Sequence, residues 1–205
     1  ATYSRVVGSR VVAKVNPCHK PAGSSEGGQF CETGGGTNYR MWDVSELQEQ
    51  NRTWDKKLTQ EERAELEAYT GYGFQVINER LRKAKGKELD THRLRERVAL
   101  LDAAVGKNIL DRPVVVTRGV GPTALEKLQS LEVGGVFVDY GFTSTTIRTA
   151  PPMGTTKVSV RVPSGVHAAP INGLSDHPSE QELLLPRGTK FRRLPGEGLQ
   201  FEVVK

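Results

Sequence analysis

The sequence has few cysteines, few aromatic residues and no long apolar run. Aromatic side chains make up 6% of its 205 residues, and no apolar stretch approaches the roughly 18 residues that a membrane-spanning helix needs. Cys18 and Cys31 are too few for the disulfide framework of a small secreted domain. Even with His19 they supply only three of the four ligands of a structural zinc site. We therefore expect a soluble globular protein with neither a metal nor a membrane span.

The usual nucleotide-binding loops are also missing. No G-x-G-x-x-G occurs, and TGGGT (33–37) is neither preceded by a strand pattern nor followed by a helix with Lys-Ser or Lys-Thr. The 29 Lys and Arg exceed the 24 Asp and Glu by five, which favours acidic partners such as nucleic acid or phosphate-bearing ligands. Nucleic acid stays open as a partner, but no motif supports it.

Glycine is concentrated near the start of the chain. Residues 16–38 are rich in glycine and contain few apolar side chains, so burial cannot offset their backbone entropy. We expect a flexible region over residues 1–40, in which a few valines could form one short strand (Val6, Val7, Val11, Val12 and Val15), and one folded domain over residues 41–205. PAGSSEGGQF (21–30) resembles a low-complexity segment of bacteriophage head-associated proteins, which hints at origin only. Because no charged-then-apolar leader opens the chain, we expect a fragment or processed product and leave its compartment open.

The first half of the folded domain has helical patterns. Thr59 and Glu62 match a capping box at the start of one helix. Asp90 or Thr91 can cap another. Apolar residues recur at helical spacing in three stretches: Leu66 and Tyr69; Phe74, Ile77 and Leu81, with Gly86 as a stop; and Leu94, Val98, Leu101 and Val105. Three amphipathic helices are therefore expected between Trp42 and Val105.

The second half has strand patterns. After Arg112 the chain consists of short β-branched runs punctuated by Gly and Pro: VVVT, GVFVDY, GFTSTT, KVSVRVP, ELLLP, TKFRRL and LQFEVV. Pro122 opens one short helix between the first two runs. Helices first and strands later indicate an α+β domain with antiparallel sheets and argue against a doubly wound parallel fold.

Polar residues interrupt three of these strands. Arg118 ends the run VVVTRG, where Gly119 would let the backbone turn close to a ligand. Ser144 carries a small hydroxyl that could hold a carboxylate. Glu180 and Glu182, if extended, project to one face about 6 to 7 Å apart. Each also has an ordinary interpretation. Arg118 could form a surface salt bridge, and Ser144 could simply be a small residue that fits the pleated sheet. Glu180 and Glu182 could face solvent at the start of a strand.

Taken in order, these residues resemble the R-S-E class of mono-ADP-ribosyltransferases, which includes the clostridial binary-toxin enzymes and C3-like exoenzymes. The helical segment AYTGYGFQVINERLR (68–82) is similar to the family's Tyr-Thr and Ile-Asn-x-x-Leu-Arg segment. The resemblance covers about residues 60–194. It implies two roughly perpendicular antiparallel sheets with helices at one side, and NAD bound in the cleft between the sheets.

The resemblance also implies roles for individual residues. Arg118 would hold the NAD phosphates or the nicotinamide-proximal ribose, and Ser144 would orient Glu182. Glu182 would accept the ribose 2′-hydroxyl and stabilise an oxocarbenium-like cation as nicotinamide leaves. Further dinucleotide contacts would come from Gly119, Asn78, Tyr69, Thr145 and Phe74.

The motifs depart from the family at several points. Ser-Thr-Ser is here Ser144-Thr145-Thr146, and Gly119 stands where some toxins have a second Arg. We therefore expect another phosphate contact from Lys157 or Arg161. The substrate-recognition loop NGLSDHPS (172–179) shows no evident aromatic residue for the acceptor.

Glu180 sets the expected acceptor. Family members with Glu at this position generally modify arginine, whose guanidinium needs a nearby carboxylate to orient it and take its proton. We therefore expect a monomeric, metal-free arginine ADP-ribosyltransferase that uses NAD and a target protein, secreted or injected to act in a host cytoplasm. The alternatives are an NAD glycohydrolase and a phage virion module that keeps the fold as a scaffold.

Overall fold

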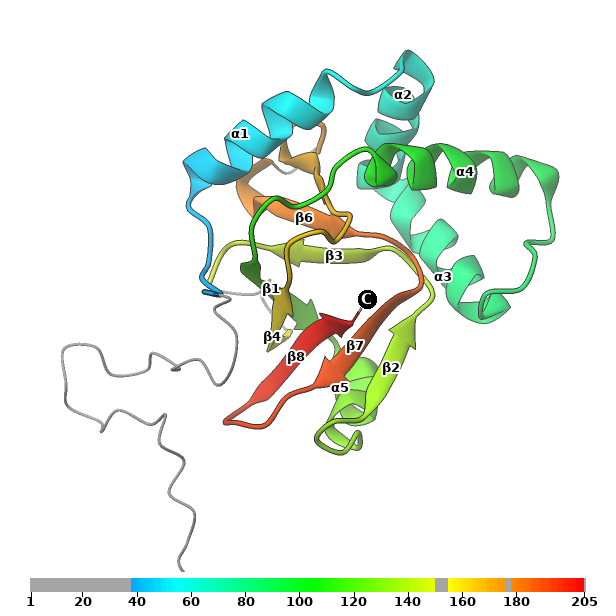
Figure 1. Cartoon of the computed structure of the whole chain (residues 1–205). Helices are drawn as coiled ribbons and strands as arrows, with labels where there is room; N and C mark the ends of the chain where they lie inside the picture. Colours follow the sequence, from blue (N-terminus) through cyan, green and yellow to red (C-terminus); the bar gives the residue numbers. More distant parts are fainter. Residues whose placement is uncertain (1–37, 150–154, 176–177, 205) are drawn as a thin grey trace, which may run out of the picture. The chain divides into compact units, whose positions relative to one another are not determined.

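Helices occupy the first part of the described chain and strands the second, as Figure 1 shows. This computed structural model describes residues 38–149, 155–175 and 178–204. The chain divides into two units, Ala1–Asn38 and Tyr39–Lys205, and the account below concerns the second. Cys18, Cys31 and the valine-rich segment lie outside the described residues.

The helical part contains one more helix than the sequence patterns predict. Its elements are α1 (Val44–Asp55), α2 (Gln60–Ala68), a π-helical turn η1 (Tyr69–Gly73), α3 (Phe74–Ala84) and α4 (His92–Gly106). The prediction missed α1 because Leu47 and Trp54 are its only buried apolar residues and form no continuous stripe. Instead, a capping box between Asp43 and Glu46 defines its start.

The predicted helix caps are confirmed. The Thr59 hydroxyl accepts from the Glu62 amide at 3.2 Å, and the Glu62 carboxylate accepts from the Thr59 amide at 2.8 Å. Thr91, rather than Asp90, caps α4 by accepting from the Leu94 amide at 3.3 Å. None of the described helices combines the length and the apolarity needed to cross a membrane.

All seven predicted strand segments form strands. These are β1 (Val114–Val120), β2 (Val136–Asp139), β3 (Thr143–Thr146), β4 (Thr156–Val162), β6 (Glu182–Leu185), β7 (Thr189–Arg193) and β8 (Leu199–Val204). A two-residue strand β5 (Ala169–Pro170) and two short 3₁₀ turns, η2 (Ile171–Gly173) and η3 (Pro178–Glu180), precede β6. The predicted short helix is α5 (Pro122–Gln129).

The strands form one hydrogen-bonded sheet with two parts, β2-β7-β8-β4-β1 and β3-β6-β5, which join between β1 and β3. Its order among the described residues is β2-β7-β8-β4-β1-β3-β6-β5. β1 meets β3 at a single pair, Thr117 opposite Thr146, and in Figure 1 β3 and β6 run across the steeper β2, β7 and β8. The α+β fold is confirmed. It differs from the expected all-antiparallel arrangement in one pairing, because β4 and β8 are parallel.

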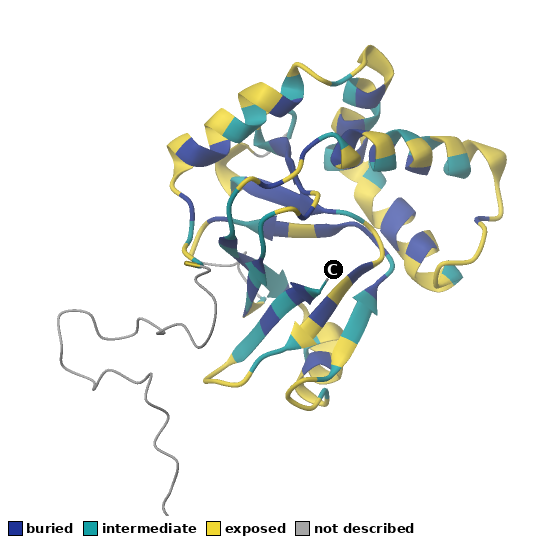
Figure 2. Cartoon of the chain, in the orientation of Figure 1, coloured by how far each residue is buried: buried dark blue, intermediate teal, exposed yellow. Residues whose placement is uncertain are grey.

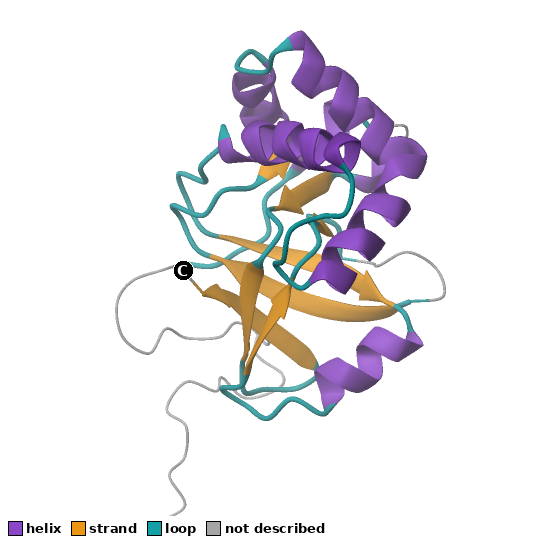
Figure 3. Cartoon of the chain, turned by 90° about the vertical axis from the view of Figure 1, so that its right-hand side faces the viewer, coloured by secondary structure: helices purple, strands orange, loops and turns teal. Residues whose placement is uncertain are grey.

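Two apolar clusters meet at β6. Leu183 and Leu185 pack into a cluster built mainly from the sheet, whereas Leu184 packs into a cluster with helical residues such as Leu66 and Ile77. In Figure 3 the helices α1 to α4 gather at one end of the strands and α5 lies at the other. All four β6 residues are therefore buried, and in Figure 2 dark-blue stretches occur on both the strands and the helices.

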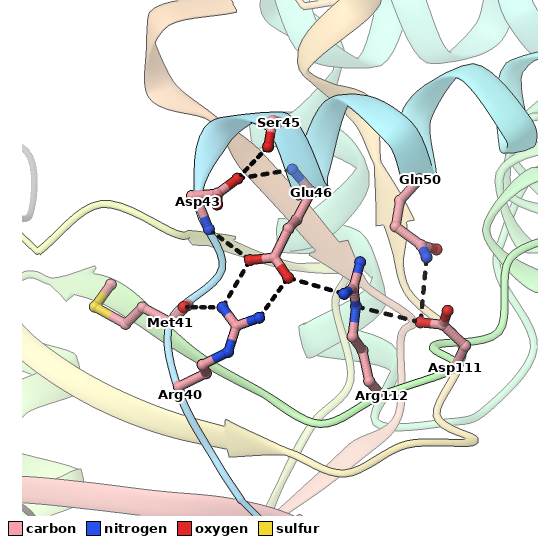
Figure 4. Close-up of polar contacts among 8 residues, drawn as sticks. All are labelled: Arg40, Met41, Asp43, Ser45, Glu46, Gln50, Asp111 and Arg112. Carbon is pink, nitrogen blue, oxygen red and sulfur yellow. Dashed lines mark hydrogen bonds and ion pairs between the residues drawn. The ribbon is translucent and has the colours of Figure 1, made fainter.

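A polar network attaches α1 to the loop before β1 (Figure 4). The Glu46 carboxylate accepts hydrogen bonds from Arg40 at 2.7 and 2.6 Å and pairs with Arg112 at 2.9 Å. Gln50 donates to Asp111 at 3.2 Å in the same network. These contacts hold the first helix against the sheet.

Candidate active site

Glu182 is a buried carboxylate at the first position of β6. The β3–β6 register places Thr146 opposite Glu182 and Ser144 opposite Leu184, so Ser144 and Glu182 share a face. The hydroxyl of Ser144, which is exposed, is hydrogen-bonded to the buried Glu182 carboxylate. Burial raises the Glu182 pKa from 4.5 to about 7; the Ser144 hydrogen bond opposes this rise and the charge of Glu180 adds to it.

Glu180 is exposed and does not extend the strand. It ends η3, and the next residue, Gln181, has a φ of 51° in the left-handed region. The expectation of two extended carboxylates on one face is therefore wrong. The turn at Gln181 instead separates a buried Glu182 from a solvent-facing Glu180, although the two remain close enough to interact electrostatically.

Arg118 lies within β1 and points to a buried carboxylate that the sequence analysis missed. Its Nη1 pairs with Asp139 Oδ2 at 3.0 Å. The strand continues through Gly119, opposite Lys157, to Val120, so the predicted turn at Gly119 is not formed. Arg82 on α3 binds the same carboxylate through Nε at 2.8 Å and Nη2 at 3.1 Å. Asp139 thus joins two guanidinium groups from a helix and a strand.

The loop around Asp139 completes its hydrogen bonds. The Thr143 hydroxyl donates to Oδ2 and the Gly141 amide to Oδ1, each at 3.0 Å. Burial acts to raise the pKa of Asp139, but the hydrogen bonds and charges of Arg82 and Arg118 outweigh it and lower the pKa. Arg82 ends the Ile-Asn-x-x-Leu-Arg segment, which was the available signal for this residue; Asp139 had none beyond ending a strand.

Asn78 and Tyr69 form buried hydrogen bonds next to the Asp139 loop. The Asn78 amide donates to the Tyr69 hydroxyl at 2.9 Å, and its Oδ1 accepts from the Phe142 amide at 2.8 Å. Both side chains are buried, and the Tyr69 ring packs edge-on against Phe142 at 5.7 Å. These contacts give both residues a structural role, and their contact with the dinucleotide stays a prediction.

Two further predicted contacts lie apart from the charged groups. Thr145 is buried and its hydroxyl donates to the Leu183 carbonyl, so this group serves the sheet. Phe74 begins α3 with 40% of its surface exposed, and within the described chain no ring or cation–π contact joins it to Arg118.

Lys157 and Arg161 lie on the face of the sheet opposite to Arg118, so the geometry does not support the phosphate contact expected of them. Both alternate with Val158, which stands opposite Arg118, so they project from the other face of the sheet. Arg161 lies over the Tyr39 ring at 5.7 Å. Arg82 replaces them as the second cation near Arg118.

Tyr69, at the start of the helical segment, is close enough to the charged residues of the site to be affected by them. Burial raises the pKa of Tyr69, and the charges that act on this hydroxyl are those of Glu182, Arg82 and Asp139. Two cavities of about 300 and 310 Å³ beside the β6–β7 turn contain none of these residues. We therefore identify the candidate site from the contacts and charges of its side chains and not from a cavity.

This arrangement combines two chemical capacities. Two guanidinium groups can bind a diphosphate, and a carboxylate in a buried setting can stabilise a cation that develops during bond cleavage. Among the described residues, no three His, Cys, Asp or Glu side chains come together in a way that could hold a metal ion.

Comparison with known proteins identifies the family. The sequence profile of the ADP-ribosyltransferase exoenzyme family matches residues 46–193, a range that contains Arg82, Arg118, Ser144, Glu180 and Glu182. No curated protein matches the sequence.

Solved structures show the same fold. Plx2a, a toxin from Paenibacillus larvae, is 20% identical with a TM-score of 0.68 over 78% of this chain and 94% of its own. The C3 exoenzyme of Clostridium limosum is 17% identical, with a TM-score of 0.69 over 82% of this chain and 98% of its own. C3stau2 from S. aureus, solved with NAD, is 20% identical with a TM-score of 0.66 over 83% of this chain and 100% of its own. With the profile match over most of its length, the chain belongs to the ADP-ribosyltransferase exoenzyme family, whose members use NAD as the donor of ADP-ribose.

Proposed function

We propose that this enzyme transfers ADP-ribose from NAD to arginine on a target protein and releases nicotinamide. One observation carries the proposal: a buried carboxylate, Glu182, is hydrogen-bonded to Ser144, and an exposed carboxylate, Glu180, lies two residues before it. The first suits the cleavage of NAD and the second suits an acceptor that arrives from solvent.

In this proposal, Arg82 and Arg118 bind the diphosphate of NAD. Asp139 engages Nη1 of Arg118 and both Nε and Nη2 of Arg82. Each guanidinium keeps further N–H donors, because arginine has five. Asp139 therefore fixes the orientation of the two groups without using up their capacity to donate.

Glu182 acts on the ribose next to nicotinamide. The bond between ribose C1′ and the nicotinamide nitrogen breaks, its electron pair leaves with nicotinamide, and positive charge develops on C1′ and the ring oxygen. The Glu182 carboxylate accepts a hydrogen bond from the 2′-hydroxyl and stabilises this charge. The Ser144 hydrogen bond favours the charged form of Glu182 that this role requires.

Glu180 acts on the acceptor. A nitrogen of the arginine guanidinium attacks C1′, a C–N bond forms, and the nitrogen must lose one proton. Glu180 accepts that proton and aligns the guanidinium beforehand. Water in place of arginine would give NAD hydrolysis without need of Glu180.

The test measures nicotinamide release and labelling of agmatine, a small guanidine acceptor, from labelled NAD. We expect Glu182→Ala to lose both activities, by at least about a hundredfold, as when a group that stabilises transition-state charge is removed. Glu180→Gln should lose agmatine labelling and retain nicotinamide release.

Each contrary result has a distinct meaning. Unchanged nicotinamide release by Glu182→Ala would refute its role in cleavage. Equal loss of both activities in Glu180→Gln would refute the division of labour between the carboxylates. Absence of saturable NAD binding by calorimetry would instead support a scaffold that has only the fold.

A further inference from the structure

The turn that carries Glu180 is held by three consecutive residues that follow the Ser-Thr pair of β3. Arg148 Nη1 donates to the Ser179 carbonyl at 3.0 Å. The Thr146 hydroxyl donates to the Glu180 carbonyl. The Ile147 amide donates to the Gln181 carbonyl at 3.3 Å. Three successive carbonyls, 179 to 181, are thus bound by residues 146 to 148.

A fourth contact organises this bracket of residues 146–148. The Arg148 amide donates to the Thr146 hydroxyl at 3.0 Å. Because the hydroxyl accepts there, its own proton is directed to the Glu180 carbonyl. Arg148 therefore acts on the turn twice, through its side chain and through its backbone.

The turn needs such support. Gln181 has a φ of 51°, which is unfavourable for a residue with a side chain. Within the described chain, the Glu180 carboxylate is exposed and has neither a hydrogen bond nor an ion pair of its own. The position of that carboxylate consequently depends on the backbone of residues 179–181.

Arg148 is the member of the bracket whose side chain lies outside the contacts assigned to NAD cleavage. Thr146 lies opposite Glu182 in the β3–β6 ladder, and Ile147 contributes a backbone amide. Arg148 lies beyond the end of β3, is exposed, and contacts neither Glu182 nor the Asp139 cluster.

We propose that Arg148 is a positioning residue for Glu180 and sets how ADP-ribose divides between an arginine acceptor and water. This inference rests on the proposed role of Glu180 as the carboxylate for the acceptor. When the Arg148 side chain is removed, the turn keeps the two remaining contacts, but Glu180 is held less firmly. Transfer to a guanidine then falls, while cleavage of NAD, which depends on Glu182, continues.

The experiment compares Arg148→Ala, Arg148→Lys and wild type by agmatine labelling and by nicotinamide release without agmatine. Agmatine labelling by Arg148→Ala should fall about ten- to a hundredfold, the range expected when a reacting group is misplaced. Nicotinamide release and the KM for NAD should stay within about twofold of wild type, since groups that bind and cleave NAD are untouched. Arg148→Lys, which can still donate one hydrogen bond, should restore part of the transfer. Arg52→Ala, an exposed arginine on α1, is the matched control and should leave both activities unchanged.

The double variant separates positioning from other roles. If Arg148 acts through Glu180, adding Arg148→Ala to Glu180→Gln should cause no further loss of transfer. A raised KM for NAD with a parallel fall in both activities would show that Arg148 acts on NAD, and would overturn the inference. If Arg148→Ala transfers ADP-ribose normally while Glu180→Gln does not, the inference about Arg148 is overturned. The proposed function would then stand. Normal transfer by Glu180→Gln would refute the proposed function itself.

Discussion

At the residue scale, burial of Glu182 favours its neutral form, whereas its proposed role requires a negative charge. Burial raises its pKa to about 7, yet its proposed role requires the ionised form. The Ser144 hydrogen bond lowers the pKa and so opposes burial. The small serine hydroxyl therefore has an electrostatic function in addition to orienting the carboxylate.

This conflict predicts the pH dependence of NAD cleavage. Glu182 must lose its proton, so kcat/KM for NAD should rise with pH up to its pKa of about 7 and then level off. Ser144→Ala removes the contact that lowers the pKa, so the midpoint should move to higher pH. Nicotinamide release between about pH 5 and 9 measures both profiles. A midpoint that stays in place or moves lower in Ser144→Ala would contradict this account.

At the element scale, α3 is joined to the loop before β3 by a buried amide. Asn78 serves the Tyr69 hydroxyl and the Phe142 amide at once, and Arg82, one turn further along α3, reaches Asp139. A shift of α3 would therefore move one of the two guanidinium groups of the site. If Arg82 binds NAD as proposed, the contacts of this helix affect both the stability of the domain and NAD binding.

Removing the amide should destabilise the domain. Asn78→Ala leaves two buried polar groups without partners, at a cost of about 2–4 kcal/mol in the free energy of unfolding. The neighbouring Glu79→Ala, at an exposed position of the same helix, should stay within about 0.5 kcal/mol of wild type. Urea unfolding measures both. Equal stability of the two variants would show that Asn78 does not join α3 to the loop.

At the scale of the whole molecule, two apolar clusters bring distant segments to one site. The sheet cluster holds the strand of Arg118 and the helical cluster holds the helix of Arg82. β6, which starts with Glu182, contributes apolar residues to both clusters. Local patterns were enough to predict all seven long strands, the cap at Thr59 and the order of the motif residues. Glu180 and Glu182 stand out in the sequence as carboxylates at the start of an apolar run, but their proposed roles come from the family resemblance.

Other features depended on tertiary contacts that no local pattern reveals. Asp139 is an ordinary strand end until Arg82 and Arg118 converge on it. The left-handed Gln181 has no signal in the sequence, since glycine usually occupies such a conformation. The misplaced Lys157 and Arg161 show that charge alone does not reveal which face of the sheet a residue occupies.

The acceptor tests the central claim most directly. A lysate of candidate host cells can be treated with the enzyme and NAD, and peptides that carry ADP-ribose can be identified by mass spectrometry with fragmentation that preserves the modification. The account predicts ADP-ribose on arginine side chains, present with wild type and absent with Glu180→Gln. ADP-ribose on asparagine or another residue, or on arginine with both enzymes alike, would contradict it.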